Sequence, residues 1–103
     1  MAREYDKLVR DGIPEIVRQN GEEPTIHVAD DAEYADRLAE KLGEEVAEYR
    51  DSRDVEELAD VLEVVHAIRE EHGLTGDELA ALRARKADRR GRFGERIVLE
   101  RVD

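Results

Sequence analysis

Residues 44–60 read EEVAEYRDSRDVEELAD, and this stretch decides the fold. Two acidic clusters lie in it on opposite sides of a short break: the first is Glu44, Glu45 and Glu48, and the second is Glu57 and Asp60. If the chain folds back at residues 51–53, Glu48 comes level with Glu57 and Glu45 comes level with Asp60. Four carboxylates at one level repel one another unless a cation lies between them. The stretch therefore predicts a helical hairpin with a divalent-cation site.

Apolar residues recur at helical spacing on both sides of the break. We expect one helix from about residue 31 to 50, with Asp30 and Glu33 at its start in the manner of a capping box. A second helix is expected from about residue 54 to 71, ending at His72-Gly73. The apolar stripe of the first helix is Ala35, Leu38, Leu42, Val46 and Tyr49. The stripe of the second is Val55, Leu58, Val61, Leu62, Val65 and Ile68.

Outside the hairpin the elements are shorter. Pro14 fits the first turn of a short helix that ends at Asn20-Gly21, and Thr75 with Glu78 predicts a capping box opening a helix through about Arg89. Short strands are expected at residues 5–9, 25–28 and 96–99, with the first and last able to pair. The expected fold is mainly α, a single domain over residues 1–103 with short strands near both termini.

The composition is strongly acidic, with 28 Asp and Glu residues against 17 Lys and Arg and a net charge of −11. Such a surface repels nucleic acid, so we expect no nucleic-acid partner. Arg outnumbers Lys, which together with the acidity fits adaptation to high salt. There is no cysteine, no apolar run long enough for a membrane span and no apolar signal-like N-terminus, so we expect a soluble cytoplasmic protein.

Helical geometry places the five carboxylates differently. Glu57 and Asp60 share a flank with Val64, which favours partial burial, and Glu45 lies near the apolar stripe of its own helix. Glu44 points nearly opposite that stripe, towards water. A buried charge needs a partner, and two kinds are open: a basic side chain such as Lys41, one turn before Glu45, or one or two divalent cations.

Beyond these acids, the chain resembles a known family. Glu44-Glu45-x-x-Glu48 followed by Glu57-x-x-Asp60 is similar to the all-α nucleoside triphosphate pyrophosphohydrolases of the MazG type. The resemblance extends to the opening at residues 5–15 and to the ending at residues 86–99, which look like a small subgroup of predicted house-cleaning enzymes. Gly12 and Arg92 depart from that subgroup's usual pattern.

The resemblance implies a helical bundle completed by oligomerisation, as a homodimer or homotetramer. It also implies Mg²⁺, or Mn²⁺, held by Glu45, Glu48, Glu57 and Asp60, with Glu44 as a supporting acid. The implied reaction is hydrolysis of a nucleoside triphosphate to the monophosphate and pyrophosphate. Glu44 and Glu48 are the candidate catalytic residues that accept the proton of the attacking water.

A phosphate tail also needs basic residues, since the protein is acidic. The candidates for nucleotide binding are Lys7, Arg10, Lys86, Arg89 and Arg90. The last three equally fit favourable charge at a helix C-terminus. Two other functions remain open at this point: a phosphoribosyl-ATP pyrophosphohydrolase, and a non-catalytic acidic helical interaction module.

Overall fold

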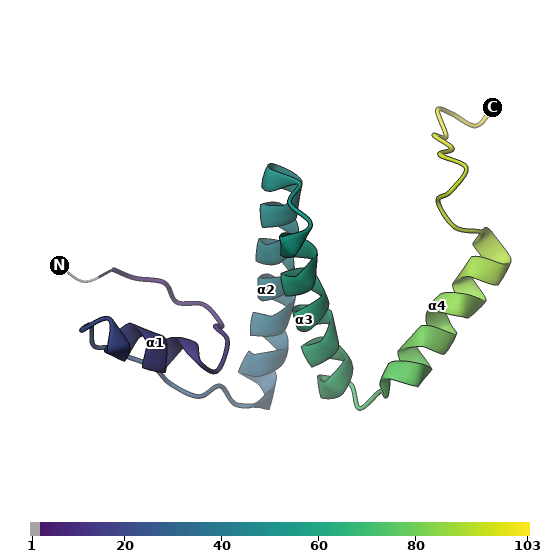
Figure 1. Ribbon diagram of the computed structural model, residues 1–103. Coiled ribbons are helices and arrows are strands. Elements are labelled where there is room, and N and C mark those ends of the chain that lie inside the picture. Colours follow the sequence, from purple (N-terminus) through teal and green to yellow (C-terminus); the bar gives the residue numbers. More distant parts are fainter. Residues whose placement is uncertain (1–2) are drawn as a thin grey trace.

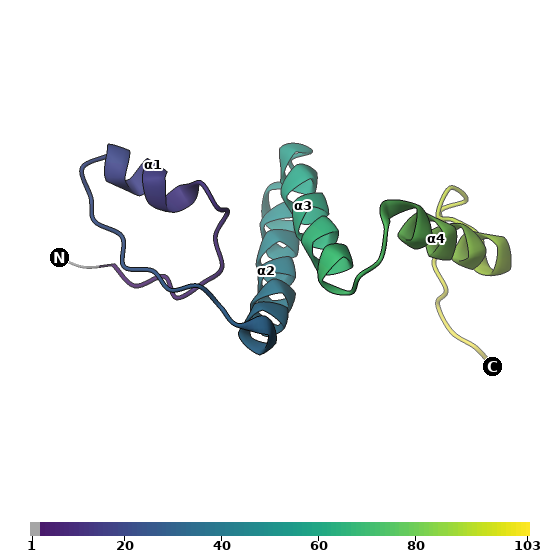
Figure 2. The ribbon, with the colours of Figure 1, turned by 90° about the horizontal axis from the view of Figure 1, so that it is seen from below.

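The computed structural model describes residues 3–103, and their regular secondary structure is helical. The chain runs through α1 (Ile13–Gln19), α2 (Asp31–Ser52), α3 (Glu56–Glu71) and α4 (Gly76–Arg90). Helices α2 and α3 lie side by side as an antiparallel hairpin, while α1 and α4 stand away from it on opposite sides (Figures 1 and 2). The prediction of a mainly α chain is confirmed.

Local signals set the helix ends. The Asp30 side chain accepts a hydrogen bond from the Glu33 N–H and caps α2, and Thr75 and Glu78 form the reciprocal capping box of α4. Arg53, with a left-handed φ of 59°, ends α2 and begins the turn into α3. Helix α2 runs two residues past the expected end at Arg50, so Asp51 and Ser52 belong to the helix and the turn starts at Arg53.

The expected strands are wrong. Residues 5–9, 25–28 and 96–99 form no strand in the described part of the chain. The first and last of these segments lie on opposite sides of the molecule, so they cannot pair within one chain (Figure 1). A β-branched or apolar run becomes a strand only when a neighbouring strand accepts its backbone hydrogen bonds, and here none is within reach.

The buried core is small and lies between α2 and α3. Leu38 is 3% exposed and Val64 is 8% exposed, and burying a side chain of this kind contributes roughly 1.5–3 kcal/mol. The radius of gyration is 18.0 Å, against about 13 Å for a compact domain of this length. The hairpin is thus the part of the chain that packs, and its inner face carries the site described below.

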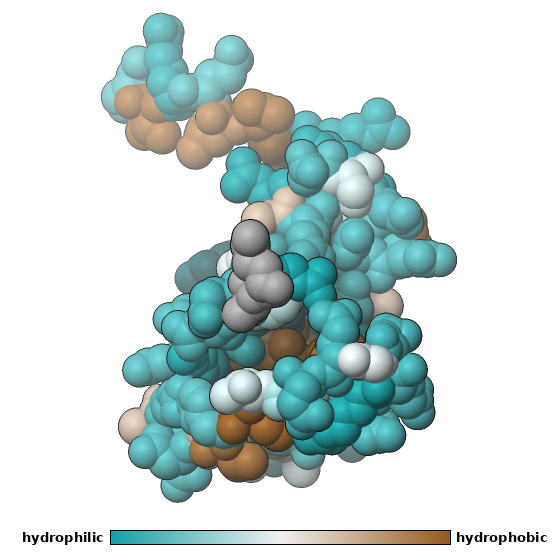
Figure 3. All heavy atoms as spheres, turned by 90° about the vertical axis from the view of Figure 1, so that its left-hand side faces the viewer, coloured by the Kyte–Doolittle hydropathy of each residue, from teal (hydrophilic) through white to brown (hydrophobic). Residues whose placement is uncertain are grey.

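Many apolar side chains remain on the surface. Val55, just before α3, and Leu58 and Leu62 on α3 face outward, with Leu62 66% exposed. In the C-terminal segment, residues 93–103, the exposed apolar residues are Phe93, Ile97, Val98, Leu99 and Val102. Figure 3 shows apolar atoms in the distant upper part of the molecule, where this segment lies, and a mostly polar face in front. None of the helices within residues 3–103 is both long and apolar enough to cross a membrane.

Candidate metal centre

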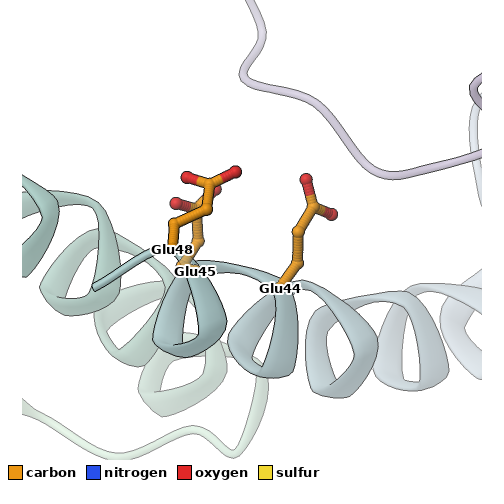
Figure 4. Close-up of side chains that lie close together, drawn as sticks. All are labelled: Glu44, Glu45 and Glu48. Carbon is orange, nitrogen blue, oxygen red and sulfur yellow. The ribbon is translucent and has the colours of Figure 1, made fainter. Parts of the chain in front are cut away.

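The hairpin gathers the five acidic residues into two overlapping groups. Carboxylate oxygens of Glu44, Glu45 and Glu48 lie within 4.8 Å of one another, and so do those of Glu45, Glu57 and Asp60. Glu45 belongs to both groups and therefore joins α2 to α3. The three α2 carboxylates point to the same side of their helix, with Glu45 and Glu48 close together (Figure 4). The expected contact of Glu45 with Asp60 across the hairpin is present.

Glu45 is the buried member of the cluster, at 7% exposed. One of its oxygens, Oε1, forms an ion pair with Lys41 Nζ at 3.1 Å. The other oxygen, Oε2, is buried and has no hydrogen-bond partner. A buried carboxylate oxygen without a donor is costly, and the neighbouring acids Glu57 and Asp60 add to that cost because they are acceptors as well. Such an arrangement calls for a positive charge beside Oε2.

Three basic side chains contact the cluster. Lys41 lies between Glu44 and Glu45, Lys7 Nζ is 3.1 Å from Glu44 Oε1, and Arg10 Nη2 is 2.8 Å from Asp60 Oδ1. Among the described residues, these are the cations that pair with the five carboxylates. Five negative charges against three positive ones leave two negative charges, and Glu48 and Glu57 are the members without an ion pair. One divalent cation matches this residual charge.

The electrostatics of the cluster divide its members. Glu45 raises the pKa of Glu48 in two ways: its carboxyl can share a proton with Glu48, and its negative charge disfavours ionisation of Glu48. Burial raises the pKa of Glu57, and the charges of Asp60 and Glu45 raise it further. Burial would also raise the pKa of Glu44, but the hydrogen bond from Lys7 and the charges of Lys41 and Lys7 outweigh it and lower that pKa. The uncompensated charge is therefore on the side of Glu48 and Glu57.

The orientation expected for Glu44 is corrected by the structure. Helical geometry alone turns Glu44 towards water, yet its side chain is 31% exposed and lies with Glu45 and Glu48. The reason is that a glutamate side chain is long enough to lean along the helix surface, and Lys7 and Lys41 attract its carboxylate from the cluster side. Glu48 is exposed and groups with Glu44 and Glu45, and it lies near enough to Glu57, its expected neighbour across the hairpin, for the charge of Glu57 to raise its pKa.

The five expected phosphate-binding residues fall into two sets. Lys7 and Arg10 lie at the cluster, where they pair with Glu44 and Asp60. Lys86, Arg89 and Arg90 lie near the C-terminal end of α4, which diverges from the hairpin, so one chain does not bring them to the carboxylates (Figure 1). Arg89 and Arg90 occupy the last turn of α4, where positive charge also favours the helix dipole.

Two residues near the cluster were not singled out from the sequence. Arg37 contacts Asp6 through two hydrogen bonds, and Asp6 directly precedes Lys7. A signal was available, because Arg37 is four residues before Lys41, which is four before Glu45, and i,i+4 spacing puts all three on one flank. Nothing in the sequence near Asp6 indicates its contact, since it joins residues 31 positions apart.

The donor set suits a hard cation. The cluster supplies carboxylate oxygens from two rigid helices and contains no sulfur or imidazole ligand, which favours Mg²⁺ or Mn²⁺ over softer metals. The buried, unpartnered Oε2 of Glu45 is the point at which such an ion fits. Lys41 is the basic partner that was one of the two alternatives for Glu45. It pairs with Oε1 of Glu45 and leaves Oε2 without a partner.

Comparisons with known proteins give a partial likeness. No protein-family model matches the chain, and no solved structure matches it. An uncharacterised protein of Mycolicibacterium smegmatis is 52% identical over 50 residues, which cover 47% of this chain and 51% of that protein. The chain thus spans about half the length of the curated relative that it matches. That relative carries no named activity.

Proposed function

We propose that the protein hydrolyses a nucleoside triphosphate to the monophosphate and pyrophosphate with the help of Mg²⁺ or Mn²⁺. The observation that carries the proposal is the buried carboxylate of Glu45, whose Oε2 has no partner and which joins the two acidic groups. Oxygen-only cation sites in proteins commonly serve phosphate chemistry. The order of motifs along the chain, described above, supports the same reaction class.

In this proposal Glu45, Glu57 and Asp60 hold the cation, with Glu48 at the edge of the site. A cation held there would act as a Lewis acid: it would offset the negative charge of phosphate oxygens and make a water molecule easier to deprotonate. The oxygen of that water forms a bond to the α-phosphorus, the anhydride bond to the β-phosphate breaks, and pyrophosphate leaves. The carboxylates of the cluster accept the proton of the water.

Between the two candidate bases, the contacts favour Glu48. Glu44 accepts from Lys7 and from Lys41, and Lys41 is on the same helix and stays beside it, so its ionised form is stabilised and it is the weaker base. Glu48 is exposed and has no ion pair among the described residues. An exposed carboxylate beside the cation site can approach a water molecule and release its proton to solvent afterwards. Glu44 then keeps the supporting role that the family resemblance implies.

The proposal includes a homo-oligomer, either a dimer or a tetramer. Two helices with a small core cannot close a bundle, and the outward face of α3 carries Leu58 and Leu62, with Val55 exposed just before the helix. A second copy packed on this face would bury these side chains. It would also give the basic end of α4, with Lys86, Arg89 and Arg90, a route to the phosphate tail at another copy's cluster.

A screen for pyrophosphate release tests the function directly. The panel contains ordinary nucleoside triphosphates, damaged ones and phosphoribosyl-ATP, each with Mg²⁺ or Mn²⁺ at low and at high salt. Release from one class identifies the substrate. Release from none, with intact folding, contradicts the proposal.

Isothermal titration with Mg²⁺ separates a cation site from a solvated acidic surface. The double variant Glu57→Gln, Asp60→Asn should lose tight Mg²⁺ binding, because it neutralises two of the three carboxylates in the group that includes Glu45. The matched control is Glu63→Gln, which neutralises an exposed acid of the same helix outside the cluster. Equal weak binding by wild type and both variants would favour the acidic interaction module instead.

A further inference from the structure

Arg37 holds the N-terminal segment against α2 through a single residue. Its Nη1 donates to the Asp6 carbonyl oxygen at 2.8 Å, and its Nη2 donates to Asp6 Oδ1 at 2.8 Å. The Arg37 side chain is 21% exposed, and the hydrogen bond that it donates to Asp6 raises the pKa of its guanidinium. Two bonds from one planar group to one residue fix both the position and the orientation of Asp6.

Asp6 adopts a backbone conformation that needs such support. Its φ is 45°, in the left-handed region that residues other than glycine seldom occupy, although aspartate tolerates it better than most. Asp6 directly precedes Lys7, whose ammonium reaches Glu44. Strained backbone that is held by side-chain contacts is characteristic of residues whose placement matters for binding.

The segment that follows the anchor carries two cations to the two ends of the acidic cluster. Lys7 pairs with Glu44 on α2, and Arg10 pairs with Asp60 on α3. Both pairs are partly open to solvent: Lys7 is 39% exposed and Arg10 is 57% exposed. Partly exposed ion pairs are worth little and exchange readily, so a stronger competitor for the carboxylates can displace either cation.

We propose that residues 6–10 form a phosphate-binding arm positioned by Arg37, whose two cations leave Glu44 and Asp60 for a polyphosphate when a divalent cation occupies the cluster. A doubly charged ion competes better for these carboxylates than an ammonium or guanidinium group does. Lys7 and Arg10 are then left uncompensated beside the site, and Arg37 keeps them there. This inference rests on the proposed function for its cation site and names Arg37 as a positioning residue.

Inorganic triphosphate and Mg²⁺ are the probes for the positioning role. In Arg37→Lys, which loses the two-pronged contact, and in Asp6→Asn, triphosphate affinity measured with Mg²⁺ present should fall about tenfold. The affinity for Mg²⁺ alone should stay within about twofold, since neither residue contacts the cation site. Arg3→Gln is the control, because it breaks another ion pair of the N-terminal segment, to Glu22. A parallel loss of both affinities would show a merely structural role and overturn the proposal.

If Lys7 and Arg10 exchange partners in this way, removing either one should change the affinities for Mg²⁺ and for triphosphate in opposite directions. In Lys7→Gln and in Arg10→Gln, Mg²⁺ alone should bind about two- to fivefold more tightly, because a competitor for Glu44 or Asp60 is gone. Triphosphate should bind more weakly. Arg18→Gln, which removes a cation paired with Glu15 far from the cluster, should change neither. Weaker binding of both probes by Lys7→Gln and Arg10→Gln would contradict the exchange.

The same measurements separate this inference from the proposed function. If the variants behave as expected but the wild type releases no pyrophosphate from any nucleotide, the arm stands and the hydrolase proposal fails. If the wild type hydrolyses a nucleotide but triphosphate affinity is unchanged in Arg37→Lys and Asp6→Asn, the arm is overturned and the hydrolase stands. Failure of the wild type to bind triphosphate at all also overturns the arm.

Discussion

The α2–α3 hairpin and the region from α4 to the C-terminus are made of similar residues but reach different degrees of packing. The hairpin buries Leu38, Val64 and Glu45 between two long helices. Helix α4 has well-formed ends, with a capping box and Gly91 beyond its last residue, yet it buries no residue, and Phe93 after it is 97% exposed. Caps thus define where a helix begins and ends, whereas a core needs a second apolar surface.

The two regions also treat charge differently. The hairpin places an acidic residue in its most protected layer, where an apolar side chain would pack at lower cost. Helix α4 keeps its charged residues on the surface, where water solvates them. Within residues 3–103 the hairpin is the pair of helices that buries side chains, and a carboxylate buried there lowers stability, which fits a site kept for binding.

The largest expected effect tests the core of the hairpin. Leu38→Ala removes the most buried apolar side chain and leaves a cavity between α2 and α3, so the free energy of unfolding should fall by about 3 kcal/mol. Leu82→Ala, on α4, should cost less than about 1 kcal/mol in the monomer, because Leu82 is 40% exposed. Denaturant titration at low protein concentration gives both values. Equal costs would erase the distinction between the two regions.

The next effect tests the buried acid. Glu45→Gln should reduce nucleotide hydrolysis about 100-fold, the upper end of the loss seen when groups supporting a metal site are removed. The metal-free protein should be no less stable than wild type, because the substitution removes a buried carboxylate that has one unpartnered oxygen, while Lys41 keeps Glu44 as its partner. Asp36→Asn, an exposed acid on the same helix, is the control. A loss of stability equal to that of Leu38→Ala would make Glu45 a structural residue.

A smaller effect concerns the outward face of α3. Leu62→Gln should weaken self-association about tenfold, because a second copy would cover this 66% exposed side chain in the proposed oligomer. Sedimentation velocity over a range of protein concentrations measures the change, and circular dichroism should show unchanged helix content. Unaltered association would place the interface elsewhere, with the C-terminal segment as the next surface to test by the same method.

Much of the helical part of the fold could be predicted from sequence because its signals are local. The capping pair Thr75 and Glu78, and the start of α2 at Asp31, depend on residues within one turn of each other. The prediction of strands is wrong for the opposite reason. Residues 5–9 and 96–99 have suitable side chains, but a strand needs a partner strand, and the fold does not bring one near. Local pattern predicts helices better than it predicts pairing.

The site divides in the same way. The meeting of Glu45 with Asp60 follows from equal distances to one turn, so helical spacing predicts it. The contacts of Asp6, Lys7 and Arg10 with the hairpin join residues 31 to 50 positions apart, and no periodicity encodes them. The predicted direction of the Glu44 side chain is wrong because a helical position fixes the Cα–Cβ direction but not the position of the carboxylate at the end of a flexible side chain.

The smallest expected effect is a change in melting temperature with pH, which should occur for acids of the hairpin and not for those of α4. In the folded protein the pKa values of Glu48 and Glu57 are raised above the ordinary carboxyl value of 4.5, so folding disfavours their ionised forms. Their contribution to stability is therefore fully present below pH 4.5 and is lost as the pH rises through the raised values. The double variant Glu48→Gln, Glu57→Gln should melt at a higher temperature than wild type at pH 7 without metal, and the gap should close by about pH 4.

Saturating Mg²⁺ at pH 7 should reverse that order. The ion binds the ionised carboxylates of the wild type and stabilises it, by about 2.7 kcal/mol at 100 times the dissociation constant, while the neutral variant gains little. Asp88→Asn on α4 should melt like wild type in every one of these conditions, because its charge is outside the cluster. If Mg²⁺ instead raised the melting temperature of wild type and double variant equally, the ion would be acting on the acidic surface as a whole. The hairpin would then differ from α4 in packing alone.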